Sequence, residues 1–300
     1  MPRAVKAGPD LAGYLEAAKL DEPLFGDIQK HVLKKALEPS GRRQDVMHPS
    51  EIIKPDWCHR AAFFRLRENR EPKKHIGFQK ENIFEEGHRT HAKWQEWLKD
   101  MNRLAGDWRC RACDLVFWND TTPQDCPRCA APSRAIDYAE VPLNASTLRI
   151  SGKSDGYCPH DGCLIEIKTM GLGSLRYEQP GFLARYEVET PEHGTLIDLM
   201  RLWKDFRRPL PSAVRQTQLY MYLARHFEDL PVDRTVFFYD FKPTQDTKSY
   251  VVLYDESISD PVIEAAEAIT DCLATDTPPF CNFNGRAGCE ACTQYHEEMT

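Results

Sequence analysis

The segment SGKSDGYCPHDGCLIEIKTM, residues 151–170, contains an aspartate, a glutamate and a lysine whose spacing could bring them together. Side chains alternate between the two faces of a strand, so Glu166 and Lys168 share one face while Ile165 and Ile167 share the other, core-like face. Asp155 comes near the charged pair if the chain folds back at residues 159–162. This pattern predicts either a surface salt bridge, which contributes little to stability, or a divalent-metal site with a catalytic lysine.

Four cysteines form two closely spaced pairs in the segment CRACDLVFWNDTTPQDCPRC. Each pair has the pattern C-x-x-C, and a short polar loop separates them. Two tight turns that each present two sulfurs to one ion provide the tetrahedral thiolate shell of structural zinc. We therefore predict a zinc ribbon at residues 108–132, with free thiols in a loop as the alternative. Its ligands would be Cys110, Cys113, Cys126 and Cys129.

A second group of three cysteines lies near the C-terminus: Cys281, Cys289 and Cys292. Three thiolates make an incomplete metal site, so a fourth ligand is expected from elsewhere in the chain. Cys58 is the best candidate, and a site that joined it to the C-terminal group would act as a clasp between the two ends of a domain. The alternatives are a zinc knuckle completed by His59 or His296, or buried thiols without a metal.

The chain has 300 residues, and its length and composition are ordinary for a globular protein. Its formal net charge of −7 does not by itself suggest that it binds nucleic acid. No segment has the layout of a signal peptide, and no apolar run is long enough to span a bilayer. We therefore expect a cytoplasmic protein without membrane contact. In that reducing compartment, the 11 cysteines favour metal or redox chemistry over disulfides.

Hydrophobic periodicity and turn residues predict the elements that must position these side chains. Helices are expected near 27–37, over 47–70 after a Pro-Ser start, and over 83–99, 195–208, 211–227 and 262–274. Strands are expected near 137–143, 147–157, 163–169, 235–241 and 249–255. We divide the chain into an N-terminal helical extension, 1–45, and one domain, 46–300, which includes the ribbon and a helical insertion at 171–211.

Two of the predicted helices carry polar residues on a defined face. His91 lies with Trp94 and Leu98 on the apolar face of the helix at 83–99, where a histidine is most often a satisfied core residue. Gln216 and Tyr220 are four residues apart and therefore share a face of their helix. Taken singly, each of these features is more typical of structure than of function.

The order of the motifs along the chain resembles that of the PD-(D/E)xK superfamily of restriction-endonuclease-like nucleases. A cysteine after PSEI is followed by G-x-x-x-H on a helix, G-x-x-D, E-x-K, Q-x-x-x-Y and the C-terminal cysteines. More closely, it resembles the RecB-like nucleases with an iron–sulfur cluster, which include Cas-four-type exonucleases and the AddB nuclease domain. The resemblance covers about residues 47–295, without the ribbon and the 171–211 insertion. It implies an α/β fold in which helices flank a mixed sheet.

The resemblance also implies roles for individual residues. Lys168 would position or activate the attacking water, and Gln216 and Tyr220 would orient the site and the DNA backbone. Glu140 lies where the family often has a glutamate near the site. The ligands of Mg²⁺ or Mn²⁺ would be His91, Asp155, Glu166 and the main-chain carbonyl of Ile167. A [4Fe–4S] cluster would be bound by Cys58, Cys281, Cys289 and Cys292.

We therefore expect a metal-dependent DNA exonuclease that acts on single-stranded ends in recombination, repair or replication. A divalent metal and a nearby lysine provide the activated water and the neutralised charge that phosphodiester hydrolysis needs. The alternatives are an inactive DNA-binding module, against which Asp155, Glu166 and Lys168 argue, and a complex-forming partner in CRISPR adaptation or phage recombination. A run of basic residues is expected to contact DNA phosphates, and the alternative is that it forms a solvated helix face without a nucleic-acid partner. These residues are Arg60, Arg65, Arg67, Arg70, Lys73 and Lys74.

Overall fold

The computed structural model describes residues 23–39, 41–69, 71, 77–282, 289 and 292. Its internal contacts divide the chain into two units, one formed by residues 1–42 and 73–86 and the other by residues 43–72 and 87–300. The first unit therefore includes a segment, 73–86, that the sequence assigned to the main domain. Within the described residues, no helix is long and apolar enough to cross a membrane.

The described part of the first unit consists of two helical segments. Helix α2 (Pro23–Ala36) corresponds to the helix predicted near 27–37. The second segment is the beginning of α5 (Phe78–Asp100), which continues into the second unit from residue 87. The rings of Phe25 and Phe78 meet edge to face with centroids 5.7 Å apart.

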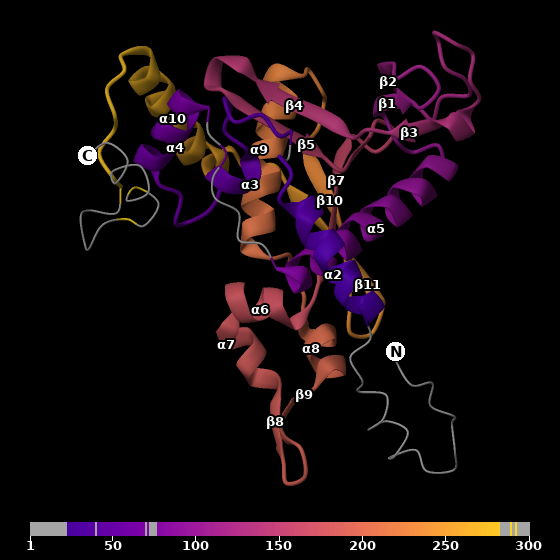
Figure 1. Ribbon diagram of the computed structural model, residues 1–300, viewed down its shortest axis with the longest axis vertical. Coiled ribbons are helices and arrows are strands. Elements are labelled where there is room, and N and C mark those ends of the chain that lie inside the picture. Colours follow the sequence, from indigo (N-terminus) through magenta and orange to yellow (C-terminus); the bar gives the residue numbers. More distant parts are fainter. Residues whose placement is uncertain are drawn as a thin grey trace. The chain divides into compact units, whose positions relative to one another are not determined.

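The second unit is built on a four-stranded mixed sheet with the order β11-β10-β7-β6. Figure 1 labels three of these strands, β7, β10 and β11. Strand β7 (Cys163–Met170) pairs in parallel with β10 (Arg234–Phe241) and antiparallel with β6 (Gly156–Cys158). Strand β11 (Asp246–Leu253) pairs antiparallel with β10. This arrangement confirms the predicted mixed α/β class. Strand β6 pairs only with residues 163–165 of β7, so the second half of β7 extends beyond it.

The two faces of the sheet are covered by different elements. On one face, Ile165 and Ile167 pack into a core with α5, whose Trp94 stacks on Phe238 with ring centroids 4.8 Å apart. This is the core face that the alternation along β7 predicted. On the other face, the aromatic side chains of β10 pack against the segment 172–210. Glu166 and Lys168 belong to this second face by the same alternation.

A second core lies between α9 (Pro211–Phe227), α10 (Glu256–Ala274) and the hairpin of β4 (Val141–Ala145) and β5 (Ile150–Ser154). The helix predicted over 47–70 is divided into α3 (Pro49–Ile52) and α4 (His59–Glu68). Pro55 lies in the interruption, where it could not donate a helical hydrogen bond. Helix α4 then begins anew after Cys58, whose sulfur accepts a hydrogen bond from the N–H of Ala61 at 3.4 Å.

The insertion at 171–211 contains a hairpin that the sequence did not predict. The helix predicted over 195–208 begins only at Leu199, because residues 195–197 belong to a strand rich in β-branched side chains. Asp198 caps this helix by accepting a hydrogen bond from the N–H of Arg201 at 3.0 Å. The elements of the insertion are α6 (Leu172–Glu178), α7 (Pro180–Leu183), a 3₁₀ turn (Ala184–Tyr186), β8 (Glu187–Thr190), β9 (Gly194–Ile197) and α8 (Leu199–Asp205).

Two predicted strands are interrupted at residues that matter for the site. The strand predicted over 137–143 is divided into β3 (Ile136–Tyr138) and β4, and Glu140 in the gap has a left-handed φ of 69°. The strand predicted over 147–157 is divided into β5 and β6, with Asp155 between them. Strand β3 joins β1 (Gly106–Cys110) and β2 (Val116–Asn119) in the ribbon sheet, and 3₁₀ turns occupy Ser133–Ala135 and Ser146–Leu148.

Candidate active site

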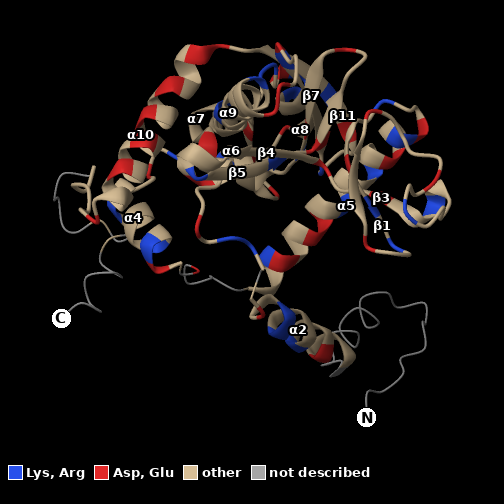
Figure 2. Ribbon diagram, turned by 90° about the horizontal axis from the view of Figure 1, so that it is seen from above, with Lys and Arg blue, Asp and Glu red and all other residues tan. Residues whose placement is uncertain are grey.

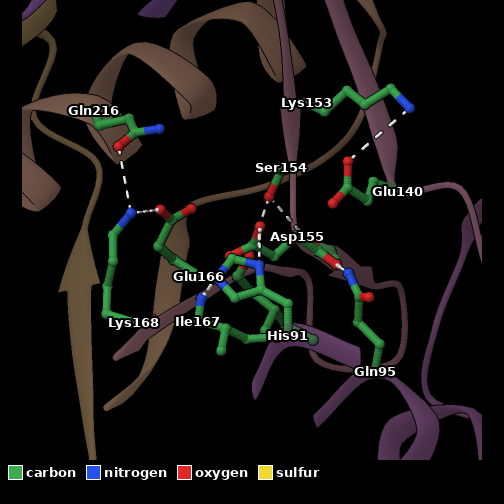
Figure 3. Close-up of polar contacts among 12 residues, drawn as sticks. His91, Gln95, Glu140, Lys153, Ser154, Asp155, Glu166, Ile167, Lys168 and Gln216 are labelled. Atoms are coloured by element: carbon green, nitrogen blue, oxygen red, sulfur yellow. Dashed lines mark hydrogen bonds and ion pairs between the residues drawn. The ribbon is translucent and has the colours of Figure 1, made fainter. Parts of the chain in front are cut away.

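Asp155 lies beside the part of β7 that extends beyond β6 (Figure 3). Its Oδ2 accepts a hydrogen bond from the main-chain N–H of Ile167 at 2.7 Å, and its Oδ1 lies 3.2 Å from His91 Nδ1. The hydroxyl of the preceding residue, Ser154, donates to main-chain carbonyls on β6 and β7, which fixes the chain where the strand breaks. The fold-back at residues 159–162 therefore brings Asp155 to β7, as the sequence predicted.

Helix α5 brings His91 to this carboxylate. Trp94 donates from its indole nitrogen to Asp240 Oδ1 at 3.1 Å, and Lys93 forms an ion pair with the same carboxylate, so the helix is fastened to the sheet. One turn after His91, Gln95 donates from Nε2 to the main-chain carbonyl of Asp155 at 2.9 Å. Gln95 was not among the predicted site residues, although its spacing of four residues from His91 places it on the same helix face.

Glu140 is the third member of a close group of possible metal ligands. One donor atom each from His91, Glu140 and Asp155 lies within 4.8 Å of the other two. Burial, and then the charge of Asp155, raise the pKa of Glu140. Its left-handed backbone conformation is uncommon for a residue with a side chain, and such strain is often found at functional sites. The sequence placed Glu140 near the site but did not include it among the ligands.

Glu166 and Lys168 form a close pair on the opposite face of β7 from the isoleucines. Lys168 Nζ lies 2.5 Å from Glu166 Oε1. The second oxygen, Oε2, is buried and has no hydrogen-bond partner among the described residues. Burial raises the pKa of Glu166 to about 7, although Lys168 opposes this shift. Burial lowers the pKa of Lys168, but the charges of Glu166 and Asp155 outweigh it, so the net shift is upward.

Helix α9 extends this pair through a chain of hydrogen bonds. Gln216 Oε1 accepts from Lys168 Nζ at 3.5 Å, and Gln216 Nε2 donates to the hydroxyl of Tyr220 at 2.7 Å. Burial raises the pKa of Tyr220 well above its usual value, so its hydroxyl stays neutral. The two residues that the sequence placed on one helix face therefore lie at the site, with Gln216 in contact with Lys168.

The donor set fits a hard divalent cation. Carboxylate oxygens with one imidazole suit Mn²⁺ and Mg²⁺, and an unpartnered buried carboxylate oxygen at Glu166 is a group that a cation would satisfy. Glu166 itself lies outside the close group of His91, Glu140 and Asp155. The N–H and C=O of one strand residue point to the same side, so the carbonyl of Ile167 also faces Asp155.

The ribbon gathers its four cysteines at one point. Their sulfur atoms lie within 4.8 Å of one another, with 3.6 Å both between Cys110 and Cys129 and between Cys113 and Cys126. Zinc–sulfur bonds of about 2.3 Å in a tetrahedron place sulfurs about 3.8 Å apart, so the group fits zinc. Burial raises the pKa of Cys126, but the N–H groups of Cys129 and Arg128 outweigh it and lower the value to about 6.

The second cysteine group also comes together, and Cys58 completes it. The sulfurs of Cys58, Cys281, Cys289 and Cys292 lie within 4.8 Å of one another, and those of Cys58 and Cys292 are 3.1 Å apart. Asn282 ties the segment further, because its Oδ1 accepts from the N–H of His59 at 3.0 Å. Four thiolates are the donor set of structural zinc and of iron–sulfur clusters alike. His59 is not needed as a ligand, and His296 lies outside the described residues.

The basic run is largely engaged within the protein. Arg65 is only 7% exposed, donates to the carbonyls of Gln44 and Val46 and pairs with Glu51, so the predicted phosphate contact at this residue is wrong. The side chains of Arg60 and Arg67 on α4 stack on phenylalanine rings, and the side chain of Arg67 is 36% exposed. Figure 2 shows arginine positions of α4 in blue. Arg70, Lys73 and Lys74 lie outside the described residues.

No protein-family model matches the chain, and no curated protein matches its sequence. Among solved structures, the chain is similar to the alkaline exonuclease LHK-Exo from Laribacter hongkongensis, with a TM-score of 0.41 and 10% identity over 90% of this chain and 100% of that chain. For LHK-Exo in complex with dAMP the TM-score is 0.40, with 9% identity over 86% and 96% of the two chains. For SSO0001 the TM-score is 0.37, with 12% identity over 89% of this chain and 93% of that chain. Likeness at these scores does not assign an activity.

Proposed function

We propose that this protein is a divalent-metal-dependent DNA exonuclease that hydrolyses phosphodiester bonds from the ends of single strands. One observation carries the proposal: His91, Glu140 and Asp155 offer donor atoms within 4.8 Å of one another, beside the Glu166–Lys168 pair, in which Glu166 is buried and has an unsatisfied carboxylate oxygen. A structural salt bridge would explain the Glu166–Lys168 pair alone. It would not explain why a histidine and two further carboxylates, Glu140 and Asp155, lie close together next to this pair.

Each residue of the site has a task that its contacts support. A divalent ion, when bound here, would supply positive charge next to the scissile phosphate and make a water more acidic. Asp155 is held in place by the N–H of Ile167, and His91 by its helix on the sheet. Lys168 is an ammonium beside two carboxylates, so it can donate a hydrogen bond to the attacking water or to a phosphate oxygen. Gln216 limits the orientations of that ammonium.

The choice of substrate is supported by the order of the sequence motifs. That order resembles the order of motifs in the RecB-like nucleases. The resemblance implies a shared site for Cys58, Cys281, Cys289 and Cys292, which we call the clasp, and their sulfurs lie within 4.8 Å of one another. The clasp joins the start of α4 to the C-terminal segment. If it closes one side of a groove at the site, a strand would thread from its end more readily than a duplex.

The test is incubation of the purified protein with end-labelled linear single strands, blunt duplex and closed single-stranded circles, with Mn²⁺, Mg²⁺ or EDTA. Linear single strands should be degraded fastest, circles slowly or not at all, and no DNA in EDTA. Asp155→Ala is the matched inactive control. Cleavage that persists in EDTA or in this variant would refute the metal site. Rapid cutting of circles would indicate an endonuclease, and DNA binding without any cleavage would favour a binding module.

A further inference from the structure

A cavity of about 550 Å³ lies next to Gln216, between α9, which also carries Gln216 and Tyr220 of the catalytic group, and two elements that the catalytic group does not use. One wall comes from α3 and the loop after it, the second from the end of α6, and the third from the start of α9. Gln216 contacts Lys168, so one side chain separates the cavity from the candidate catalytic lysine.

Hydrogen bonds between side chains and main chain hold the three walls together. The carboxylate of Glu178 on α6 accepts from the hydroxyl of Ser212 at 2.7 Å and from its N–H at 3.2 Å, which ties α6 to the start of α9. Arg215 on α9 donates from Nε to the carbonyl of Ile53 at 3.1 Å, which ties α9 to the end of α3. The cavity is therefore bounded by linked elements.

The lining combines an aromatic ring with two cations. The side chain of Tyr177 is 84% exposed and lies at the end of α6. Lys54 and Arg215 provide positive charge, while of the two acidic residues Glu178 is already bonded to Ser212 and Asp56 is exposed. A flat ring beside two cations matches a ligand that has both a flat apolar face and a phosphate. The volume lies in the range of about 300–1,000 Å³ that is typical of small-ligand sites.

We propose that this cavity holds one unpaired nucleotide of the DNA strand, with its base stacked on Tyr177 and its phosphate beside Lys54 and Arg215. This inference rests on the proposed function and specifies its substrate, because a base inside a duplex has both faces covered by its stacked neighbours and cannot stack on Tyr177. Tyr177 would then be a specificity-determining residue for single strands. It belongs to the insertion at 171–211, which the motif resemblance does not cover.

The experiment measures binding without cleavage. The full-length protein in EDTA is titrated into single strands that carry 2-aminopurine at the terminal nucleotide, and into a duplex whose ends are closed by hairpin loops and which carries the label at an internal base pair. Stacking on an aromatic side chain contributes about 1–3 kcal/mol per base, so Tyr177→Ala should weaken single-strand binding by about five-fold or more and abolish the quenching of 2-aminopurine. Duplex binding should not change. Tyr177→Phe should retain both effects, because the ring remains.

Phe227→Ala is the control for loss of a surface aromatic, because Phe227 is exposed at the other end of α9. It should leave the quenching and the single-strand affinity intact. The proposal is overturned if Tyr177→Ala leaves quenching unchanged, if it weakens single-strand and duplex binding equally, or if the cavity takes up a peptide or another small molecule and no nucleotide. Because no cleavage is needed, loss of the proposed catalytic function would leave this result intact, and failure of the stacking test would leave the metal site intact.

Discussion

At the scale of single residues, the site separates the groups that would bind metal from the group that would act on water. Asp155 contacts His91 and the backbone of β7. Lys168 instead contacts the side chains of Glu166 and Gln216. Metal affinity and turnover should therefore respond differently to substitution at these two positions. This distinction separates a catalytic lysine from a lysine that merely neutralises a buried carboxylate.

We expect Asp155→Ala to lose both metal binding and cleavage. Lys168→Ala should still bind metal but should cleave DNA about a hundred-fold more slowly or worse, because a positioned hydrogen-bond donor typically contributes that much to the rate. Metal titration by calorimetry and single-turnover cleavage would measure the two effects. Lys204→Ala, at an exposed lysine on α8, is the matched control and should change neither. Unchanged cleavage by Lys168→Ala would exclude the assigned role.

The pKa values predict a pH dependence of metal binding. Burial raises the pKa of Glu166 to about 7; for His91, burial lowers the pKa but Asp155 outweighs it and the net shift is upward. The metal-free protein therefore binds more protons folded than unfolded, and the stability from these groups is lost as pH rises through about 7. Metal binding must displace these protons. The rise in melting temperature caused by Mg²⁺ should be larger at pH 8 than at pH 6.

Glu166→Gln removes one of the two titrating groups and should flatten this pH dependence. Differential scanning fluorimetry of both proteins at matched Mg²⁺ concentrations would show it. An equal Mg²⁺ effect at both pH values in the unsubstituted protein would mean that neither Glu166 nor His91 approaches the ion.

Sequence alternation and helical spacing predicted which residues of the catalytic group meet. The period of two along β7 placed Glu166 with Lys168, and the period of four on α9 placed Gln216 with Tyr220. Glu140 and Gln95 could not be assigned in the same way. The approach of Glu140 depends on a left-handed backbone angle, and that of Gln95 on how α5 is docked by Trp94. The spacing of four residues places Gln95 on the helix face of His91, but no local sequence pattern gives the docking of α5 or the backbone angle of Glu140.

At the scale of elements, close packing between β5, α3 and α9 fixes the position of Tyr220. A methyl group on Gly152 would lie 2.8 Å from Pro49 Cγ and 3.2 Å from Tyr220 Cε1. The proline ring is rigid and cannot move aside, so one of these elements would have to shift. Gly87 on α5 differs, because a methyl group there would meet the Thr169 hydroxyl at 3.9 Å, which is an ordinary contact.

We therefore expect Gly152→Ala to destabilise the fold by about 1–3 kcal/mol, as overpacking of a core does, and to slow cleavage through displacement of Tyr220. Gly87→Ala should instead be neutral or stabilising by up to about 1 kcal/mol, because alanine is the better helix former. Urea denaturation of both variants would compare these energies. Equal stability of the two variants would contradict the packing argument.

Element boundaries were harder to predict than element types. The strands predicted over 137–143 and 147–157 do occur, but each is interrupted, and the second interruption is where Asp155 lies. A run of strand-forming residues does not reveal that its two halves pair with different partners: β5 pairs with β4, and β6 pairs with β7. Such a change of partner is decided by long-range packing rather than by local propensity.

At the scale of the whole molecule, two separate groups of four cysteines lie in two different parts of the second unit. The ribbon cysteines lie within one continuous segment and close a local sheet. The clasp joins Cys58 to residues more than two hundred positions later, next to the contact between α4 and α10. If each group binds a metal as we propose, loss of the ribbon metal should have local effects, whereas loss of the clasp metal should loosen the C-terminal segment from α4.

Metal analysis of cysteine variants would separate the two sites. Protein purified without oxygen should contain about one zinc, as a four-cysteine ribbon typically holds one ion, together with iron and acid-labile sulfide if the clasp holds a [4Fe–4S] cluster. Cys126→Ser should lose the zinc and keep the iron, and Cys281→Ser should do the reverse with the larger fall in melting temperature. Colourless protein with two zinc ions and no sulfide would show instead that the clasp is a second zinc site. The clasp would still join α4 to the C-terminal segment in that case, because both kinds of centre fix four thiolates, so only the expected iron would be wrong.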